Sequence, residues 1–446
     1  MNVVADEAVR LTPTQKRAVV AGSIGNAVEW LDWSIYSSFA PVFAGQFFAS
    51  GNPTAALLST LAVFAVGFIM RPVGGAVLGA YADRHGRKAG MTLTIGLMAG
   101  AALVIAICPT YAQIGLLAPL VLLIARLVQG FSAGGEFGSS SAFLVESAAP
   151  RRRAFAGSWQ QVSVGSGVLV ASLLGTLLSS TLSPEALSTW GWRIAFGVGG
   201  LLGVVGLWLR VSVEETAHFA ATASSGRRQK NPLWSMLVKH PGAAWRVVAM
   251  TIPGTLTYYI WISYMAPYAA SATGIPLNQA FLANTIAIIV FLCLLPFGGM
   301  LSDRIGRKPT MTGFALGYLL IAWPAFHFLQ NNFWIVLAIE LAGIILLLGY
   351  SANCAAVMAE QFPAEVRTVG ISLPYALAVA IFGGTAPYIT TYMTSNGLQG
   401  YIWLYVAAAA IVGLAVYLSM PETRARSLES APPVRGVAWA EGVNPV

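Results

Sequence analysis

The stretch Gly79-Ala-Tyr-Ala-Asp83-Arg84-His-Gly86-Arg87-Lys88 occurs a second time, with small changes, as Gly299-Met-Leu-Ser-Asp303-Arg304-Ile-Gly306-Arg307-Lys308. Each copy is a short charged turn between two long apolar segments. Internal repeats are the sequence sign of a duplicated structural unit. The doubled turn therefore predicts a chain that is built from two similar halves.

The composition is that of a protein embedded in lipid. Of the 446 residues, 57% are hydrophobic and only 9% are charged, against about 25% charged residues in soluble domains. The net charge of +8 is spread over short loops and forms no basic stripe, which argues against a nucleic-acid partner. Cys108, Cys293 and Cys354 lack the spacing of a disulfide framework or a zinc site. No other metal or cofactor motif is found.

Twelve apolar segments are long enough to cross a bilayer, which takes about 20 helical residues. We expect an all-α membrane protein with these twelve helices arranged as two pseudo-symmetric six-helix bundles. The expected spans are 18–43, 55–81, 89–108, 115–146, 154–181, 191–210, 243–270, 278–301, 309–329, 333–359, 366–393 and 398–419.

Basic residues mark one side of the membrane. Lys and Arg lie in the loops after the even-numbered spans, as at Arg84 and Arg304, whereas the other loops carry almost none apart from Arg193. By the positive-inside rule these loops and both termini are cytoplasmic. The first span has no cleavage site near it, so we expect no signal peptide.

The longest loop divides the chain into two halves. We expect a cytoplasmic N-terminal segment at 1–17, a first bundle at 18–210, a cytoplasmic linker at 211–242, a second bundle at 243–419 and a short tail at 420–446. The tail has no heptad repeat and predicts disorder rather than a coiled coil.

The doubled turn resembles the signature of the major facilitator superfamily, and the resemblance extends over the whole chain. Within the superfamily the chain resembles the metabolite:proton symporters. The matching segments are Gly25–Tyr36, Arg71–Gly75, Arg126–Glu136 and Trp190–Ile194. This resemblance implies alternating access and proton-driven uptake of a small organic acid or zwitterion. It also implies a monomeric carrier in the bacterial inner membrane that is not an enzyme and needs no cofactor.

Three charged residues are expected near the middle of the bilayer. At about 1.5 Å per residue, Glu29, Arg71 and Arg126 each lie about 16 Å from the nearest loop in a core about 30 Å thick. Asn26, Glu29, Asp32 and Tyr36 form a polar stripe along one helix face. Ionisable groups at this depth are expensive and mark functional sites.

These charges predict a carboxylate site with a proton carrier. An arginine receives a carboxylate through paired hydrogen bonds, which makes Arg71, beside Pro72, our first candidate for the substrate anchor. Arg126 and Arg193 are further candidates, and the proton-coupling candidates are Glu29, Asp32 and Glu136. The alternative is structural: Glu29 pairs with Arg126 and Asp32 with Arg71, Glu136 pairs with Arg71, and Arg193 is an interfacial anchor.

The second half offers aromatic and amide side chains in place of charges. We expect Tyr258, Trp261, Asn353 and Tyr375 to contact the substrate. The i/i+3 steps from Tyr258 to Trp261 to Tyr264 predict one aromatic helix face that closes over it. The alternative is that these side chains serve only for packing.

The charged turns themselves are candidates for a cytoplasmic gate, as the superfamily resemblance implies. Simple anchoring by positive charge is the alternative. The candidate gate residues are Asp83, Arg84, Arg87, Glu146, Asp303, Arg304, Arg307, Glu360 and Arg367.

Together with these charges, the resemblance to the metabolite:proton symporters implies a proton-coupled symporter that imports a di- or tricarboxylate such as α-ketoglutarate. Two alternatives stay open. One is a proton symporter of a zwitterion or aromatic acid, such as proline, betaine, shikimate or phthalate. The other is a proton-coupled exporter, although the span at 154–181 lacks the Gly-Pro pair of such exporters.

Overall fold

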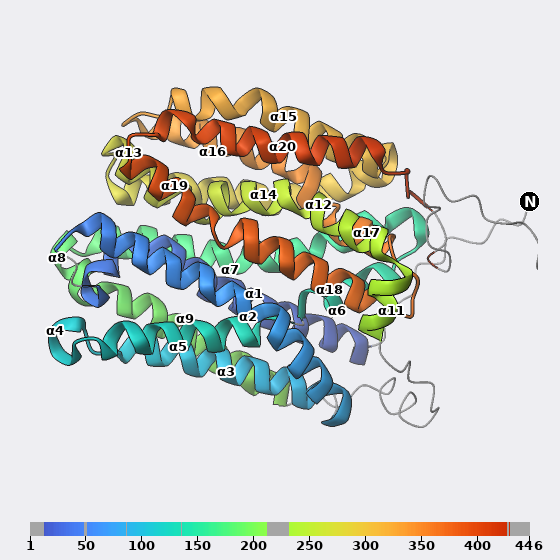
Figure 1. Ribbon diagram of the computed structural model, residues 1–446, viewed down its shortest axis with the longest axis horizontal. Coiled ribbons are helices and arrows are strands. Elements are labelled where there is room, and N and C mark those ends of the chain that lie inside the picture. The colour runs from blue at the N-terminus through green and yellow to red at the C-terminus, as the bar shows by residue number, and fades with distance from the viewer. Residues whose placement is uncertain are drawn as a thin grey trace, which may run out of the picture.

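The computed structural model describes residues 13–48, 51–85, 87–134, 136–211, 232–425 and 428, and these residues form helices joined by short loops (Figure 1). The first group of helices comprises α1 (Pro13–Phe47), α2 (Pro53–His85), α3 (Arg87–Ile107), α4 (Tyr111–Ile114), α5 (Leu117–Ser132), α6 (Glu136–Glu146), η1 (Pro150–Arg152), α7 (Arg153–Thr181), α8 (Pro184–Ala186), η2 (Leu187–Gly191) and α9 (Trp192–Val211).

The second group follows residues 212–231. It comprises α11 (Pro232–Lys239), α12 (Pro241–Tyr258), η3 (Tyr259–Tyr264), α13 (Met265–Thr273), α14 (Leu277–Ile305), α15 (Arg307–His327), α16 (Phe333–Ser351), α17 (Cys354–Ala359), α18 (Arg367–Ala378), η4 (Val379–Gly383), α19 (Ala386–Ser395), η5 (Gln399–Tyr401) and α20 (Ile402–Ser419).

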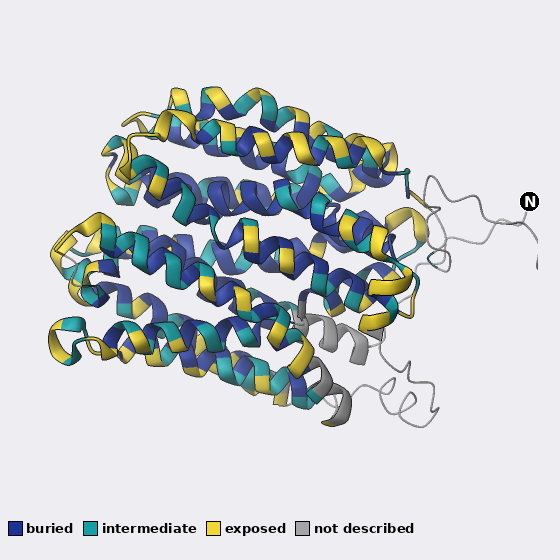
Figure 2. Ribbon diagram, viewed as in Figure 1, coloured by how far each residue is buried: buried dark blue, intermediate teal, exposed yellow. Residues whose placement is uncertain are grey.

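The two groups form two layers that meet along long helices. In Figure 1 the first group lies below the second, and α7 of the first runs along α14 of the second. Large apolar side chains such as Leu177, Phe297 and Leu320 are exposed on the outer helix faces (Figure 2). Such faces are suited to contact with lipid, because lipid tails are as apolar as these side chains.

Helices cover the ranges expected from the sequence, but several are interrupted. The range 115–146 is divided between α5 and α6, and the range 333–359 between α16 and α17. Within the described part of the chain, nine helices are long and apolar enough to cross a membrane. The total of twelve spans and the cytoplasmic position of both ends stay predictions.

Helices α2 and α5 are in direct backbone contact because glycines face each other. A Cβ atom on Gly130 would lie 1.8 Å from the Gly67 carbonyl oxygen, and one on Gly74 would lie 1.7 Å from the Phe131 carbonyl oxygen. Small residues allow this approach between membrane helices. The contact positions Arg71 of α2 beside Arg126 of α5.

This packing predicts opposite effects of the same substitution at two glycines. Gly130→Ala should destabilise the protein by about 1–3 kcal/mol, because the new methyl group overpacks the contact. Gly100→Ala, where nothing lies within 4 Å, should be neutral or stabilising by up to about 1 kcal/mol, because alanine favours a helix. Thermal unfolding of both purified variants tests the pair, and equal melting temperatures would contradict the packing account.

Candidate functional site

Four buried charges form two ion pairs between α1, α2 and α5, and we call Glu29, Asp32, Arg71 and Arg126 the four-charge cluster. The Nη2 atom of Arg71 lies 3.3 Å from Oε1 of Glu29. The Nη1 atom of Arg126 lies 3.2 Å from Oδ2 of Asp32. All four residues are at most 5% exposed. Pairing is what makes four charges tolerable at this depth, because an isolated buried charge is far more costly.

The observed ion pairs differ from the ion pairs that the sequence suggested as the structural alternative. That alternative paired Glu29 with Arg126 and Asp32 with Arg71, and it is wrong in both pairs. Glu29 and Asp32 are one helical turn apart, so each acid meets the arginine at its own level of the bundle.

Gln129 completes the second pair, and the sequence reasoning did not assign it a role. Its Nε2 donates to Oδ1 of Asp32 at 2.7 Å. The signal for this role was its position three residues after Arg126, which places both side chains on the same face of α5.

Aromatic rings enclose both guanidinium groups. Trp33 lies between them, with its ring centroid 4.7 Å from Arg71 and 5.5 Å from Arg126. Phe68 lies 4.6 Å from Arg71, and Tyr36 lies 4.0 Å from Arg126. The ring faces stabilise the cations and exclude water from them.

Both arginines keep unused donors. The Nε atom of Arg71 and the Nε and Nη2 atoms of Arg126 are buried and have no hydrogen-bond partner among the residues that the structure describes. Buried donors are nearly always paired in folded proteins, so such exceptions call for an explanation. A carboxylate ligand would satisfy them, because guanidinium groups bind carboxylates through two parallel hydrogen bonds.

The second half covers the four-charge cluster with two tyrosines. Trp30 lies 5.6 Å from the ring of Tyr258 and 5.9 Å from the ring of Tyr259. Tyr259 also packs on Phe68 at 5.6 Å. Both tyrosine hydroxyls are buried without a hydrogen-bond partner. Two further unused polar groups therefore belong to tyrosines of the second half that pack on the aromatic rings around the cluster.

The expected single aromatic face of Tyr258, Trp261 and Tyr264 is not present. Tyr259–Tyr264 is a π-helix, which has more residues per turn than an α-helix and rotates the later side chains away. Trp261 packs against Tyr318 within the second half at 5.0 Å. The hydroxyl of Tyr264 bonds that of Thr391 at 2.7 Å.

Three other predicted substrate contacts have protein partners in this structure. Tyr375 stacks on Phe137 with centroids 3.9 Å apart. Asn353 donates to the Gly349 carbonyl at 2.7 Å. Arg193 donates to the carbonyl of Ala106 in the last turn of α3 at 3.1 Å and to that of Cys108 just after the helix at 2.6 Å. The side chain of Glu136 lies outside the described part of the structure.

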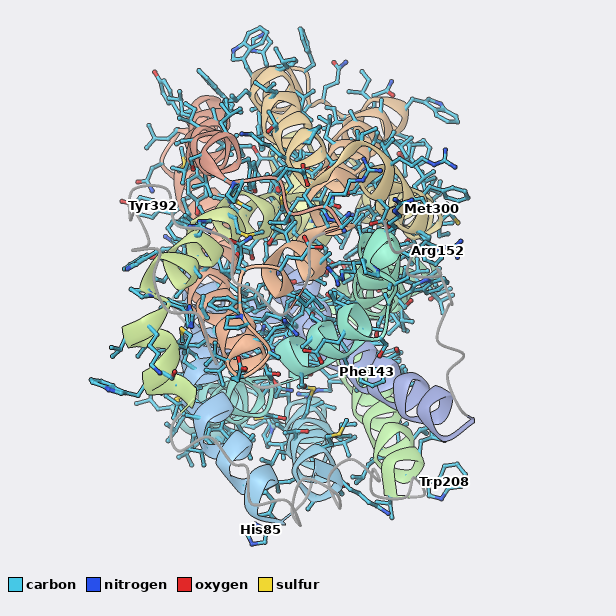
Figure 3. All side chains as sticks on the ribbon, turned by 90° about the vertical axis from the view of Figure 1, so that its right-hand side faces the viewer. His85, Phe143, Arg152, Trp208, Met300 and Tyr392 are labelled. Carbon is cyan, nitrogen blue, oxygen red and sulfur yellow. The ribbon has the colours of Figure 1, made fainter. Side chains whose placement is uncertain are left out.

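One end of the bundle carries Arg153, Arg307 and Arg367, and we call it the basic end. A second cluster of charged residues joins the two helix groups there. Figure 3 looks onto this end, where Arg152, just before α7, lies beside Met300 of α14. Asp303 accepts from the backbone N–H groups of Ala154 at 3.1 Å and Phe155 at 2.9 Å. A carboxylate of one half thus caps a helix N-terminus of the other.

Arginines extend this connection. Arg307 donates to Asp303 at 2.7 Å and to Glu360 at 3.2 Å. Arg367 pairs with Glu146 of the first group at 2.5 Å. Arg304 is exposed. The corresponding side chains of the first copy, Asp83, Arg84 and Arg87, lie outside the described part of the structure.

Glu422 holds the second copy of the doubled turn. Its carboxylate accepts from the backbone N–H groups of Arg307 and Lys308, both at 3.0 Å, and of Arg424 at 2.9 Å. Gly306 has a φ of +112°, and a Cβ there would lie 2.5 Å from Glu422, so only glycine fits. Burial alone would raise the pKa of Glu422, but the three N–H donors together with Arg307 lower it below its usual value.

This capping role predicts an acid-sensitive contribution to stability. The lowered pKa means that the contribution of Glu422 is complete above about pH 4.3, the ordinary glutamate value, and is lost as pH falls through the folded-state pKa. Glu422→Gln should lower stability by about 1 kcal/mol at pH 7, as the loss of a helix cap does. The difference from the unsubstituted protein should shrink toward pH 3.

Thermal unfolding between pH 3 and pH 7 tests this expectation. Glu365→Gln is the matched control, because Glu365 is exposed near the same end. A Glu422→Gln variant that is less stable by the same amount at every pH would contradict the role of its charge.

Comparisons with known proteins fit this geometry. The family model of the Major Facilitator Superfamily matches residues 22–373 and 257–441. Alpha-ketoglutarate permease from Escherichia coli (strain K12) is 38% identical over 94% of this chain and 97% of its own. Citrate-proton symporter from Klebsiella pneumoniae is 36% identical over 93% of this chain and 94% of its own.

A solved structure shows the same fold. The xylose transporter XylE from E. coli, in a partially occluded inward-open conformation, superposes with a TM-score of 0.72 at 19% sequence identity, covering 92% of this chain and 99% of its own. The family resemblance expected from the sequence is thereby confirmed. The chain belongs to the Major Facilitator Superfamily, and it is a multi-pass membrane transporter and not an enzyme.

Proposed function

We propose that this transporter is a proton-coupled symporter of the inner membrane that imports a small organic acid by alternating access. The observation that carries the proposal is the pair of buried arginines with unused donors, each already held by a carboxylate. At such a site an arginine can release the carboxylate of the protein and bind a carboxylate of the substrate in its place. No cofactor is needed, because the proton gradient drives the uptake.

The substrate in this proposal is a di- or tricarboxylate such as α-ketoglutarate. One carboxylate of the substrate binds Arg71, and Arg126 receives a second. The similarity to an alpha-ketoglutarate permease and a citrate-proton symporter supports this substrate class. Two fixed cations favour a dianion over a zwitterion such as proline or betaine, which brings a positive charge to the site.

Proton coupling follows from competition for the arginines. When a substrate carboxylate takes Arg71, Glu29 loses its cation while it stays buried. An unpaired buried carboxylate takes up a proton because the neutral form is then cheaper. Asp32 responds in the same way when Arg126 is engaged. Substrate and proton thus enter the closed site together, which is the linkage that symport requires.

Alternating access in this proposal uses the two helix groups, 18–210 and 243–419, as the moving bodies. The four-charge cluster is buried, so the groups must separate to admit the substrate. Residues at the basic end, chiefly Asp303, Arg307, Glu360 and the Arg367–Glu146 pair, close the cytoplasmic side. Breaking these contacts opens the site to the cytoplasm.

The first test concerns the substrate anchor. Arg71→Lys should leave a folded protein but weaken substrate binding by about tenfold to a hundredfold, because lysine cannot form the paired contact worth about 1.5–3 kcal/mol. Thermal shift of the purified protein with 2-oxoglutarate, citrate, succinate, phthalate, shikimate and proline measures binding. Arg151→Lys, at an exposed arginine, is the control, and an unchanged shift in Arg71→Lys would remove Arg71 from the site.

The second test concerns the proton carrier. Glu29→Gln and Asp32→Asn keep similar shapes and remove a titratable group, so counterflow exchange should survive while pH-driven accumulation is lost in at least one of them. Both activities are measured in proteoliposomes loaded with labelled substrate. Accumulation against a gradient by both variants would assign the proton to another residue.

A further inference from the structure

A further buried carboxyl group, Glu340, lies apart from the four-charge cluster and from the basic end, within α16 of the second group. Glu340 is 0% exposed, and no basic side chain in the described part of the chain forms an ion pair with it. A carboxylate in this position would be an uncompensated charge at membrane depth. Its free-energy cost is high, and protonation removes it.

The neighbours of Glu340 are neutral polar groups. Its Oε2 atom accepts from Nδ2 of Asn284 at 3.1 Å, whereas its Oε1 atom is buried and has no hydrogen-bond partner in the described part of the chain. The same Nδ2 lies 3.4 Å from the carbonyl oxygens of Trp261 and Ile262. Both carbonyls belong to the π-helix η3, where the changed hydrogen-bond register leaves them open to side chains.

The titratable groups on the elements packed against α16 are engaged elsewhere. On α12 and η3, Tyr258 and Tyr259 face Trp30, and Tyr264 bonds Thr391. Tyr318 of α15 donates to the Gly343 carbonyl, one turn further along α16. Five of the remaining groups lie toward the basic end: Asp303, Arg304, Arg307, Lys308 and Arg246. His327 stacks on Trp323 at the other end. Cys293 is exposed on α14, and Cys354 contacts Gln161. None of these supplies a charge to balance an ionised Glu340.

Asn284 links Glu340 to the first half of the molecule. Its Oδ1 atom accepts from the hydroxyl of Ser172 on α7 at 3.0 Å. Ser172 and Thr176 also bond the hydroxyl of Thr285, at 2.8 Å and 3.1 Å. The link crosses the seam between α7 and α14, so it is broken whenever these helices separate.

We propose that Glu340 carries an exchangeable proton, which the contact between α7 and α14 retains and their separation releases. Separation removes Ser172 from Asn284 and admits water, to which the carboxylic acid gives its proton and becomes a carboxylate. Only the O–H bond is broken, and the proton is the only species transferred. This inference rests on the proposed symport and adds a second proton site in the half that lacks the four-charge cluster.

The bound species is a proton rather than a metal cation. The space between Glu340 and the two carbonyls is already occupied by the amide nitrogen of Asn284. An N–H donor satisfies oxygen atoms that would otherwise coordinate Na⁺. A neutral acid beside this amide needs no further positive charge.

Infrared spectroscopy of the full-length protein in lipid tests the proton directly. A protonated carboxyl group gives a C=O stretching band that is distinct from the carboxylate bands. The protein should show this band at pH 7 and lose it at high pH, and Glu340→Gln should remove the Glu340 part of the band. Glu185→Gln, at an exposed glutamate, should keep it. A band of unchanged size in Glu340→Gln would overturn the inference.

Transport separates this inference from the proposed function. In proteoliposomes Glu340→Gln should still exchange substrate but carry one proton fewer per substrate molecule than the unsubstituted protein. An equal proton count in both proteins overturns the role of Glu340 and leaves symport intact. Uptake without proton movement in the unsubstituted protein overturns symport, even where the infrared band is present. Uptake that Na⁺ stimulates only when Glu340 is present would replace the proton by Na⁺ and overturn the inference.

A second variant covers the case in which Glu340→Gln does not fold. Ser172→Ala removes the hydrogen bond from α7 to Asn284 and leaves the contact between Thr176 and Thr285, so it weakens the link across the seam and favours the separated, hydrated state. The pH at which the infrared band disappears should therefore fall, corresponding to about tenfold weaker proton binding. An unchanged midpoint would show that the contact between α7 and α14 does not retain the proton.

Discussion

The cost of placing charge inside a membrane protein is the constraint on which this structure depends. Arg71 and Arg126 are each at most 3% exposed, and neither is tolerable there without an acid and a shield of aromatic rings. Glu29 and Asp32 neutralise them, and Trp33 separates them. The glycines of α2 and α5 are needed for the same reason, because only a direct backbone contact brings both cations within reach of α1.

Neutral pairing also explains why such a site is suited to transport. A buried ion pair contributes little net stability, since desolvation offsets the attraction. The pair can therefore be exchanged for another arrangement of equal charge at small cost. A substrate carboxylate on the arginine and a proton on the acid is one such arrangement. The carboxylate adds one negative charge and the proton adds one positive charge, so each pair stays neutral only if both arrive together.

The sequence predicted the parts of this structure that follow from hydrophobicity and repetition. Long apolar segments located the helices, and the doubled turn at Asp303 indicated a charged contact that the structure places between the two halves. Depth counting selected Glu29, Arg71 and Arg126 together. The ion pairs considered as the structural alternative were wrong, because a count along separate helices gives depth but not the rotation of one helix against another.

The aromatic residues of the second half show another limit of prediction from the sequence. Spacing rules assume an α-helix, and the π-helix at Tyr259–Tyr264 changes the face on which each later residue lies. Nothing in Tyr-Ile-Trp-Ile-Ser-Tyr itself predicts that change. In the structure these residues contact Trp30, Tyr318 and Thr391, which are distant in the sequence. Asn353 is similar: its amide bonds Gly349 and Thr310, and the second of these contacts depends on α15 lying alongside.

The two halves differ in whether a buried acid is paired with a cation. In the proposed cycle this difference determines which event changes the protonation of each acid. In the first half each acid has a cation, so protonation waits for a substrate carboxylate to displace it. In the second half no cation of the described chain pairs with Glu340, and in the proposed cycle Glu340 is neutral whenever water is excluded. Substrate therefore governs one site, and contact between α7 and α14 governs the other. A carrier with both kinds of site can link the occupancy of its binding site to the separation of its halves, because each event changes the protonation of a different acid.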